Sequence, residues 1–125
     1  MLNGIEALTT KALSLALDAA SLRQQAIAAN IANAGTPGYS PLKVDFESQL
    51  ETARRGLQTN GSVDSFALSQ VRPVMFAESA QEPEAVRLDT EMAALAENSV
   101  QYQALLKGLS RQFSILSAAV SDGKK

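Results

Sequence analysis

Apolar residues recur in alternating steps of three and four along both ends of this 125-residue chain. In the N-terminal part the series consists of Ile5, Leu8, Ala12, Leu15, Ala19, Leu22, Ala26 and Ala29. This spacing places the side chains on one face of an α-helix and is typical of a coiled-coil seam. It predicts a long N-terminal coiled-coil helix over residues 1–34.

A second apolar stripe runs beside the first, through Leu13, Leu17, Ala20, Ile27 and Ile31. Together the two stripes make an apolar face that is wider than a single partner helix covers. We therefore expect this helix to have several partners. If it pairs only with one other helix of its own chain, the second stripe stays in water and is available to other chains.

The C-terminal part repeats the three-four alternation through Met92, Leu95, Ser99, Tyr102, Leu106, Leu109, Phe113, Leu116 and Val120. It predicts a second coiled-coil helix over residues 89–121, with Asp89 as its N-cap. Gly108 in the helix interior costs about 1 kcal/mol relative to alanine. This favours a close approach of another helix at that position over a tolerated weakness.

Residues 35–88, between the two helices, show shorter patterns. Asp45 is a suitable N-cap for a short helix over residues 46–55, which Gly56 would end. Beyond it, alternating apolar residues separated by Gly and Pro predict a small irregular β-containing region, and these residues are Val63, Phe66, Leu68, Val71, Val74 and Phe76. The fold class is thus mainly α, a hairpin of two helices about 45 Å long with a small middle region.

The junction after the first helix predicts a sharp change of direction. Gly35 follows the last helical residue, where a left-handed cap suits glycine, and Pro37 and Gly38 occupy the central positions of a type II turn between Thr36 and Tyr39. Asn30 and Asn33 are three residues apart, so both amides lie on one face and are placed to bind backbone groups of the turn or a neighbour.

The run from Ala29 to Asn33, followed by Thr36-Pro37-Gly38-Tyr39, resembles the N-terminal signature of bacterial flagellar rod and hook proteins. The segment Val44-Asp45-Phe46, the chain length and residues 88–103 extend the resemblance to the short proximal rod members of this family. It implies a structural subunit that leaves the cytoplasm through the flagellar type III export apparatus without a cleaved signal peptide. Such a subunit polymerises in the periplasm into the torque-transmitting rod of the flagellar basal body.

The same resemblance implies which partners the chain meets. They are copies of itself, other flagellar rod proteins, the rod base adaptor, the MS ring and the flagellar export gate. The candidate site residues are the motif and turn, Asn30, Asn33, Thr36, Pro37, Gly38 and Tyr39, and the assembly seams, Ile5, Leu8, Leu15, Leu22, Ile27, Ile31, Met92, Leu95, Tyr102, Leu106, Leu109, Phe113, Leu116 and Val120.

Composition narrows the function classes. A net charge of −2 with scattered basic residues offers no electrostatic footprint for nucleic acid. A mean hydropathy of −0.04, without an apolar run near 18 residues, indicates no membrane span. The chain has neither Cys nor His, so the usual catalytic bases, nucleophile pairs and thiolate metal ligands are missing. We expect no enzyme activity, cofactor or metal.

Two alternatives to the rod subunit stay open on the sequence. The apolar stripe would also suit a helical export adaptor or a chaperone-like binding module of a type III secretion apparatus. An enzyme would have to use Glu82, Glu84, Asp89 and Glu91 as a metal or acid-base site, although such a run is more typical of a solvated connection. Tyr39 and Tyr102 suit either contact anchors or buried hydrogen-bonding residues.

Overall fold

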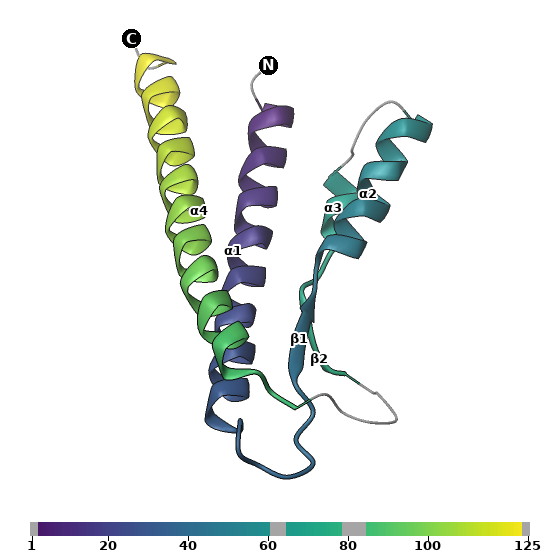
Figure 1. Cartoon of the computed structure of the whole chain (residues 1–125). Coiled ribbons are helices and arrows are strands. Elements are labelled where there is room, and N and C mark those ends of the chain that lie inside the picture. Colours follow the sequence, from purple (N-terminus) through teal and green to yellow (C-terminus); the bar gives the residue numbers. More distant parts are fainter. Residues whose placement is uncertain (1–2, 61–64, 79–84, 124–125) are drawn as a thin grey trace.

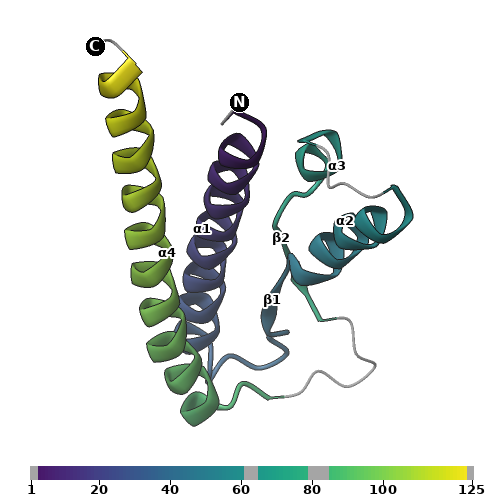
Figure 2. The ribbon, with the colours of Figure 1, turned by 90° about the horizontal axis from the view of Figure 1, so that it is seen from above.

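The computed structural model describes residues 3–60, 65–78 and 85–123. Its central element is α1 (Asn3–Ala32), which has α4 (Leu88–Gly123) on one side and the middle region on the other (Figures 1 and 2). The middle region consists of β1 (Leu42–Asp45), α2 (Glu47–Asn60), α3 (Ser65–Ser69) and β2 (Val74–Ala77). The predicted fold class, two long terminal helices paired as a hairpin with a small β-containing middle region, is confirmed.

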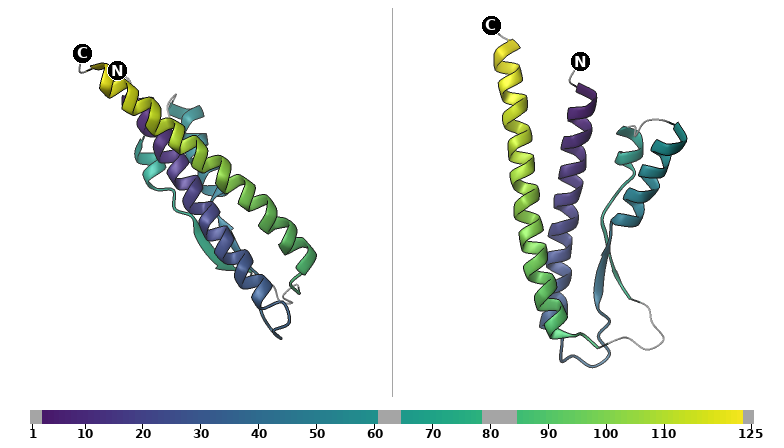
Figure 3. Two further views of the ribbon diagram at one scale, coloured as in Figure 1. Left: turned by 90° about the vertical axis from the view of Figure 1, so that its left-hand side faces the viewer. Right: turned by 45° about the horizontal axis from the view of Figure 1, so that its top comes forward.

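The two long helices run antiparallel, so that both termini lie at the same end of the molecule (Figure 3). At the crossing, a Cβ built on Gly108 would lie 3.6 Å from Leu13 Cδ2, an ordinary van der Waals distance. The expected close approach at Gly108 is therefore only moderate, because α1 reaches this glycine with a side chain and leaves room for a methyl group.

Both apolar stripes of α1 are used within the chain. Leu15 and Ala19 of the first stripe belong to one buried cluster with Phe46, Ala53, Leu68 and Val71 of the middle region. The second stripe faces α4, where Leu13 meets Gly108 and the carbonyl of Ala20 accepts a hydrogen bond from Asn98. The expectation that this second stripe stays in water is wrong, since the middle region covers the first stripe and leaves the second to α4.

The middle region contains a two-stranded antiparallel sheet, in which Leu42 pairs with Ala77 and Asp45 with Val74. β2 includes Val74 and Phe76, as predicted, whereas the sequence pattern gave no indication of β1. Phe66 and Leu68 were expected in extended structure but lie in α3, where Leu68 is turned into the buried cluster. Val63 lies outside the described residues.

Several predicted helix boundaries are shifted, and α1 ends at Ala32 and α4 at Gly123 instead of residues 34 and 121. The amide of Leu50 donates to the carbonyl of Phe46 (3.0 Å), so Phe46 takes the N-cap position and Asp45 is held in the sheet one residue earlier. α2 continues through Gly56 to Asn60. Likewise, the amide of Glu91 donates to the carbonyl of Arg87 (2.9 Å), which places the start of α4 before Asp89.

Within the described ranges, no helix is both long and apolar enough to cross a membrane.

Candidate functional site

The end of α1 and the turn after it are held by short-range hydrogen bonds. The amide of Ala34 donates to the carbonyl of Ile31 (3.3 Å) and the amide of Thr36 to that of Asn33 (3.0 Å), which tightens the last turn of the helix. Gly35 does not adopt the left-handed cap that we expected, because these bonds close the helix with negative φ. Among the described residues only Gly38 has a positive φ, of 75°.

The turn at residues 36–39 has the geometry that its sequence predicts. The amide of Tyr39 donates to the carbonyl of Thr36 (3.3 Å), and the positive φ of Gly38 is the value that a type II turn requires at its third position. Asn33 supports the same turn, since its Nδ2 donates to the carbonyl of Ala29 (2.8 Å) and its Oδ1 accepts from Thr36 Oγ1 (3.2 Å).

Asn30 is the hub of this junction and is 2% exposed. Its Nδ2 donates to the carbonyl of Leu42 (3.0 Å), while its Oδ1 accepts from the amide of Leu42 (2.8 Å). The side chain therefore pairs with both backbone groups of Leu42, as a neighbouring strand would, and attaches β1 to α1. The remaining lone pair of Oδ1 accepts from the hydroxyl of Tyr39 (2.8 Å).

The second Asn30 donor reaches the other long helix, because Nδ2 also donates to Glu91 Oε2 (3.3 Å) in the first turn of α4. One amide thus connects the end of α1, the turn, β1 and the beginning of α4. Partial burial, and then the negative charge of Glu91, raise the pKa of the Tyr39 phenol above its usual value, so Tyr39 stays a neutral donor. Tyr39 acts as a hydrogen-bonding residue here, whereas Tyr102 is 40% exposed.

The α1 seam residues lie mainly inside the chain. Leu15 and Ile27 are buried, and Leu8, Leu22 and Ile31 are half-buried. Ile5 is 81% exposed, because it lies beyond the part of α1 that the middle region covers.

The α4 seam divides into two groups. Leu95, Leu109 and Leu116 are half-buried on the side that faces α1. The other five remain 40–61% exposed, and they are Met92, Tyr102, Leu106, Phe113 and Val120. We call these five residues the α4 stripe.

The α4 stripe is a continuous uncharged surface. By helical spacing its five residues lie along one side of α4, next to the side that meets α1. Glu97, Lys107 and Arg111 project from the far side of the helix, and the positions between the stripe residues are mostly serine. Sequence periodicity did not indicate Val100 and Ile115, which are also exposed but lie on the charged side, off the three-four series.

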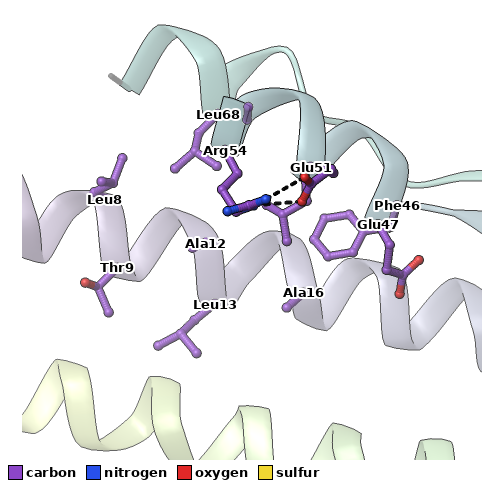
Figure 4. Close-up of a pocket in the computed structure, with 12 residues that line it drawn as sticks. Leu8, Thr9, Ala12, Leu13, Ala16, Phe46, Glu47, Glu51, Arg54 and Leu68 are labelled. Atoms are coloured by element: carbon purple, nitrogen blue, oxygen red, sulfur yellow. Dashed lines mark hydrogen bonds and ion pairs between the residues drawn. The ribbon is translucent and has the colours of Figure 1, made fainter. Parts of the chain in front are cut away.

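An apolar groove of about 750 Å³ separates α1 from α2 and α3 (Figure 4). Leu8 of α1 and Leu68 of α3 point toward one another across it, and Phe46 closes one end. The charged residues at its rim are paired, Glu47 with Arg23 and Glu51 with Arg54, and the latter pair lowers the pKa of Glu51 through its hydrogen bonds. The groove offers packing surface rather than a converging set of reactive groups.

Only two of the four acidic residues considered as an enzyme site lie among the described residues. Glu82 and Glu84 lie outside the described residues, while Asp89 and Glu91 occupy the first turn of α4. There Asp89 accepts from the amide of Thr90 (2.8 Å) and Glu91 from Asn30, so both carboxylates have structural partners. In the described part of the chain, no three acidic residues gather in a way that would hold a metal ion.

Comparisons with known proteins match the part of the chain that contains this junction. The family model for flagella basal body rod proteins matches residues 1–39, which are α1 and the turn. The flagellar basal body rod protein FlgB of Bacillus subtilis is 32% identical over 93% of this chain and 95% of its own length. The chain belongs to the FlgB family of flagellar basal body rod proteins.

Other FlgB proteins agree over similar lengths. That of Yersinia ruckeri is 32% identical over 86% of this chain and 90% of its own, and that of Escherichia coli is 31% identical over 86% and 89%. The protein is therefore a structural subunit of the flagellar basal body rod and not an enzyme, and an export adaptor or chaperone is not favoured.

Proposed function

We propose that this FlgB-family chain polymerises through its terminal helices into the periplasmic drive shaft, after export through the flagellar type III apparatus without a cleaved signal peptide. Its partners are copies of itself, other rod proteins, the rod base adaptor, the MS ring and the export gate. Membership of the rod protein family supports assembly with other flagellar components.

The observation that carries the proposal is the α4 stripe. α1 is covered on both sides within the chain, whereas five large side chains of α4 are left in water along one uncharged side. An exposed apolar surface of this kind marks protein–protein contact. We assign the contacts between subunits to the α4 stripe and to the exposed Ile5 end of α1, and no longer to the inner seam residues of α1.

The motif and turn residues have a different role in this proposal. The side chains of Asn30, Asn33 and Tyr39 bind one another's segments and the neighbouring elements, although residues 36–38 of the turn stay exposed. They fix the direction in which the chain leaves α1 and so hold the middle region against it. Because close-packed interiors deform little, a subunit braced in this way resists twist.

The proposal is tested by charging the stripe. Leu106→Asp places a carboxylate where a dry contact is expected, at a cost of several kcal/mol in every copy. The variant chain should be made and exported but should not enter the rod, so that the cells do not swim. Motility assays and immunoblots of purified basal bodies measure both steps.

The matched control is Ala104→Asp, which adds the same charge to the same helix on the side that carries Lys107 and Arg111. We expect it to support swimming, as should Lys107→Ala. Normal basal bodies that contain the Leu106→Asp chain would show that the stripe is not in the packed core of the rod.

A further inference from the structure

Asn98 is a buried polar residue in the contact between the two long helices, and it is 4% exposed. Its Nδ2 donates across the interface to the carbonyl of Ala20 (2.9 Å) and to Gln24 Oε1 (2.8 Å), both on α1. We infer that Asn98 sets the register of α4 against α1, selecting one alignment among several that the apolar contacts alone would allow.

A gain in stability does not explain why an asparagine occupies position 98. Within the described part of the chain its Oδ1 has no hydrogen-bond donor, although this atom is shielded from water. A buried polar atom without a partner is unfavourable compared with an apolar side chain of similar size. What the amide contributes is position, because its two donors are satisfied only where α1 presents matching acceptors.

The rest of the interface is repetitive and defines the alignment poorly. Leu95, Leu109 and Leu116 on α4 are separated by whole heptads, so sliding the helix by one heptad keeps the same side toward α1. In one direction the slide puts Leu109 in the place of Leu116 and Tyr102 in the place of Leu109. α1 offers Leu, Ile and Ala at similar intervals. Gln112 lies on the same side of α4 but is only half-buried, and it keeps access to water in any register.

A slip of one heptad would remove the Gln24 side-chain acceptor of Asn98. It would also put the larger Leu13 or Ile27 in the place of Ala20. Since Asn98 lies beside Ala20 and Gln24, the shifted amide would face either the region of Leu13 and Leu17 or that of Ile27 and Ile31. There it meets apolar side chains in place of Gln24. The slip would move α4 by about 10 Å along α1 and carry the whole α4 stripe with it.

The experiment reads the register with engineered disulfides, which the absence of native cysteine makes unambiguous. Leu13→Cys with Gly108→Cys reports the alignment seen here, where these two positions are in contact. Leu13→Cys with Gln101→Cys, or with Ile115→Cys, reports a slip of one heptad in either direction. Each pair is made in the full-length purified chain, with Asn98 retained or replaced by Asn98→Leu.

With Asn98 retained, the 13–108 cross-link should dominate. In Asn98→Leu the ratio of this cross-link to the shifted ones should fall by about tenfold or more, which corresponds to the discrimination of one buried hydrogen bond. The melting temperature should change little, because the leucine removes the unpaired Asn98 Oδ1 while Gln24 Oε1, on a half-buried residue, loses its donor. Ser99→Ala should leave the register unchanged, because the Ser99 hydroxyl donates to the carbonyl of Leu95 in its own helix.

The inference is overturned if Asn98→Leu keeps the 13–108 cross-link alone, whether or not it melts at a lower temperature. It is also overturned if Glu91→Ala, which removes the hydrogen bond from Asn30 to α4, releases the register while Asn98→Leu does not. The cross-links are read on the isolated chain, so either result leaves the proposed role in the rod untouched.

Discussion

At the scale of single residues, the amide of Asn30 shows how one side chain can define a junction. A primary amide has two donors and two acceptor lone pairs. In this structure all four are used, on both backbone groups of Leu42, on the Tyr39 hydroxyl and on the Glu91 carboxylate. A serine, glutamine or aspartate at this position cannot reproduce that set of bonds.

Asn30→Asp is therefore expected to destabilise the chain by about 2–4 kcal/mol at neutral pH. The carboxylate has no donors for Leu42 or Glu91, and it adds a negative charge beside Glu91. Its pKa would be raised in the folded state, so protonation favours folding, and the deficit should be smallest at low pH and grow as the pH rises through that value. Urea unfolding followed by circular dichroism at several pH values measures it.

Asn33→Asp is the matched control, because it makes the same change of charge at the partly exposed end of α1, where Nδ2 donates to the carbonyl of Ala29. We expect less than half the loss seen for Asn30→Asp. Equal losses would show that the four-bond hub is not what holds the junction.

At the scale of elements, α4 combines three different sides along one helix. One side meets α1, the α4 stripe is apolar and exposed, and the far side carries Glu97, Lys107 and Arg111. Gly108 weakens this helix, because glycine increases the freedom of the backbone. The space beside Gly108 would also accept a methyl group, so no close contact requires a glycine there.

Gly108→Ala should stabilise the isolated chain by about 1 kcal/mol, which corresponds to a rise in melting temperature of about 3–6 °C. The new Cβ would meet Leu13 Cδ2 at 3.6 Å without a clash. Gly123→Ala, at the last residue of α4, should change the melting temperature little because helix ends fray. A lower melting temperature for Gly108→Ala would indicate that the helices approach more closely than described.

The elements that sequence reasoning found are those held by local periodicity. Two helices of this length repeat their apolar pattern many times, and the turn carries its own proline and glycine. β1 is four residues long and is defined by pairing with β2, far along the chain, so no local pattern indicates it. The sequence also did not indicate which side of α4 faces α1. That side includes Asn98 and Gln112, and a search for the spacing of apolar residues does not count them.

At the scale of the whole molecule, α1 is shared by two separate interfaces. On one side it packs against Phe46, Ala53 and Leu68 of the middle region, and on the other against α4. The two contacts use different sides of the same helix, so we expect one to loosen without the other.

Phe46→Ala tests this independence. Removing the buried ring should cost about 3 kcal/mol, at the lower end for phenylalanine because the neighbouring groove is already open on one side. Hydrogen exchange followed by mass spectrometry should show faster exchange in residues 42–55, while residues 88–123 keep their protection. Leu50→Ala, at a half-exposed neighbouring position, should change little. Equal loss of protection in α4 would mean that the chain unfolds as one unit.

The hub at Asn30 ties the two long helices together at one end, while their axes diverge toward the termini (Figure 1). The helices also meet at Asn98 and at Leu13 and Gly108, so the part of α4 that extends beyond these contacts is residues 109–123, about 22 Å of helix. A change of about 5° in the crossing angle moves the end of this segment by about 2 Å. Small changes of the crossing angle thus give chains of identical sequence a way to fit neighbouring positions whose spacing differs by about 2 Å.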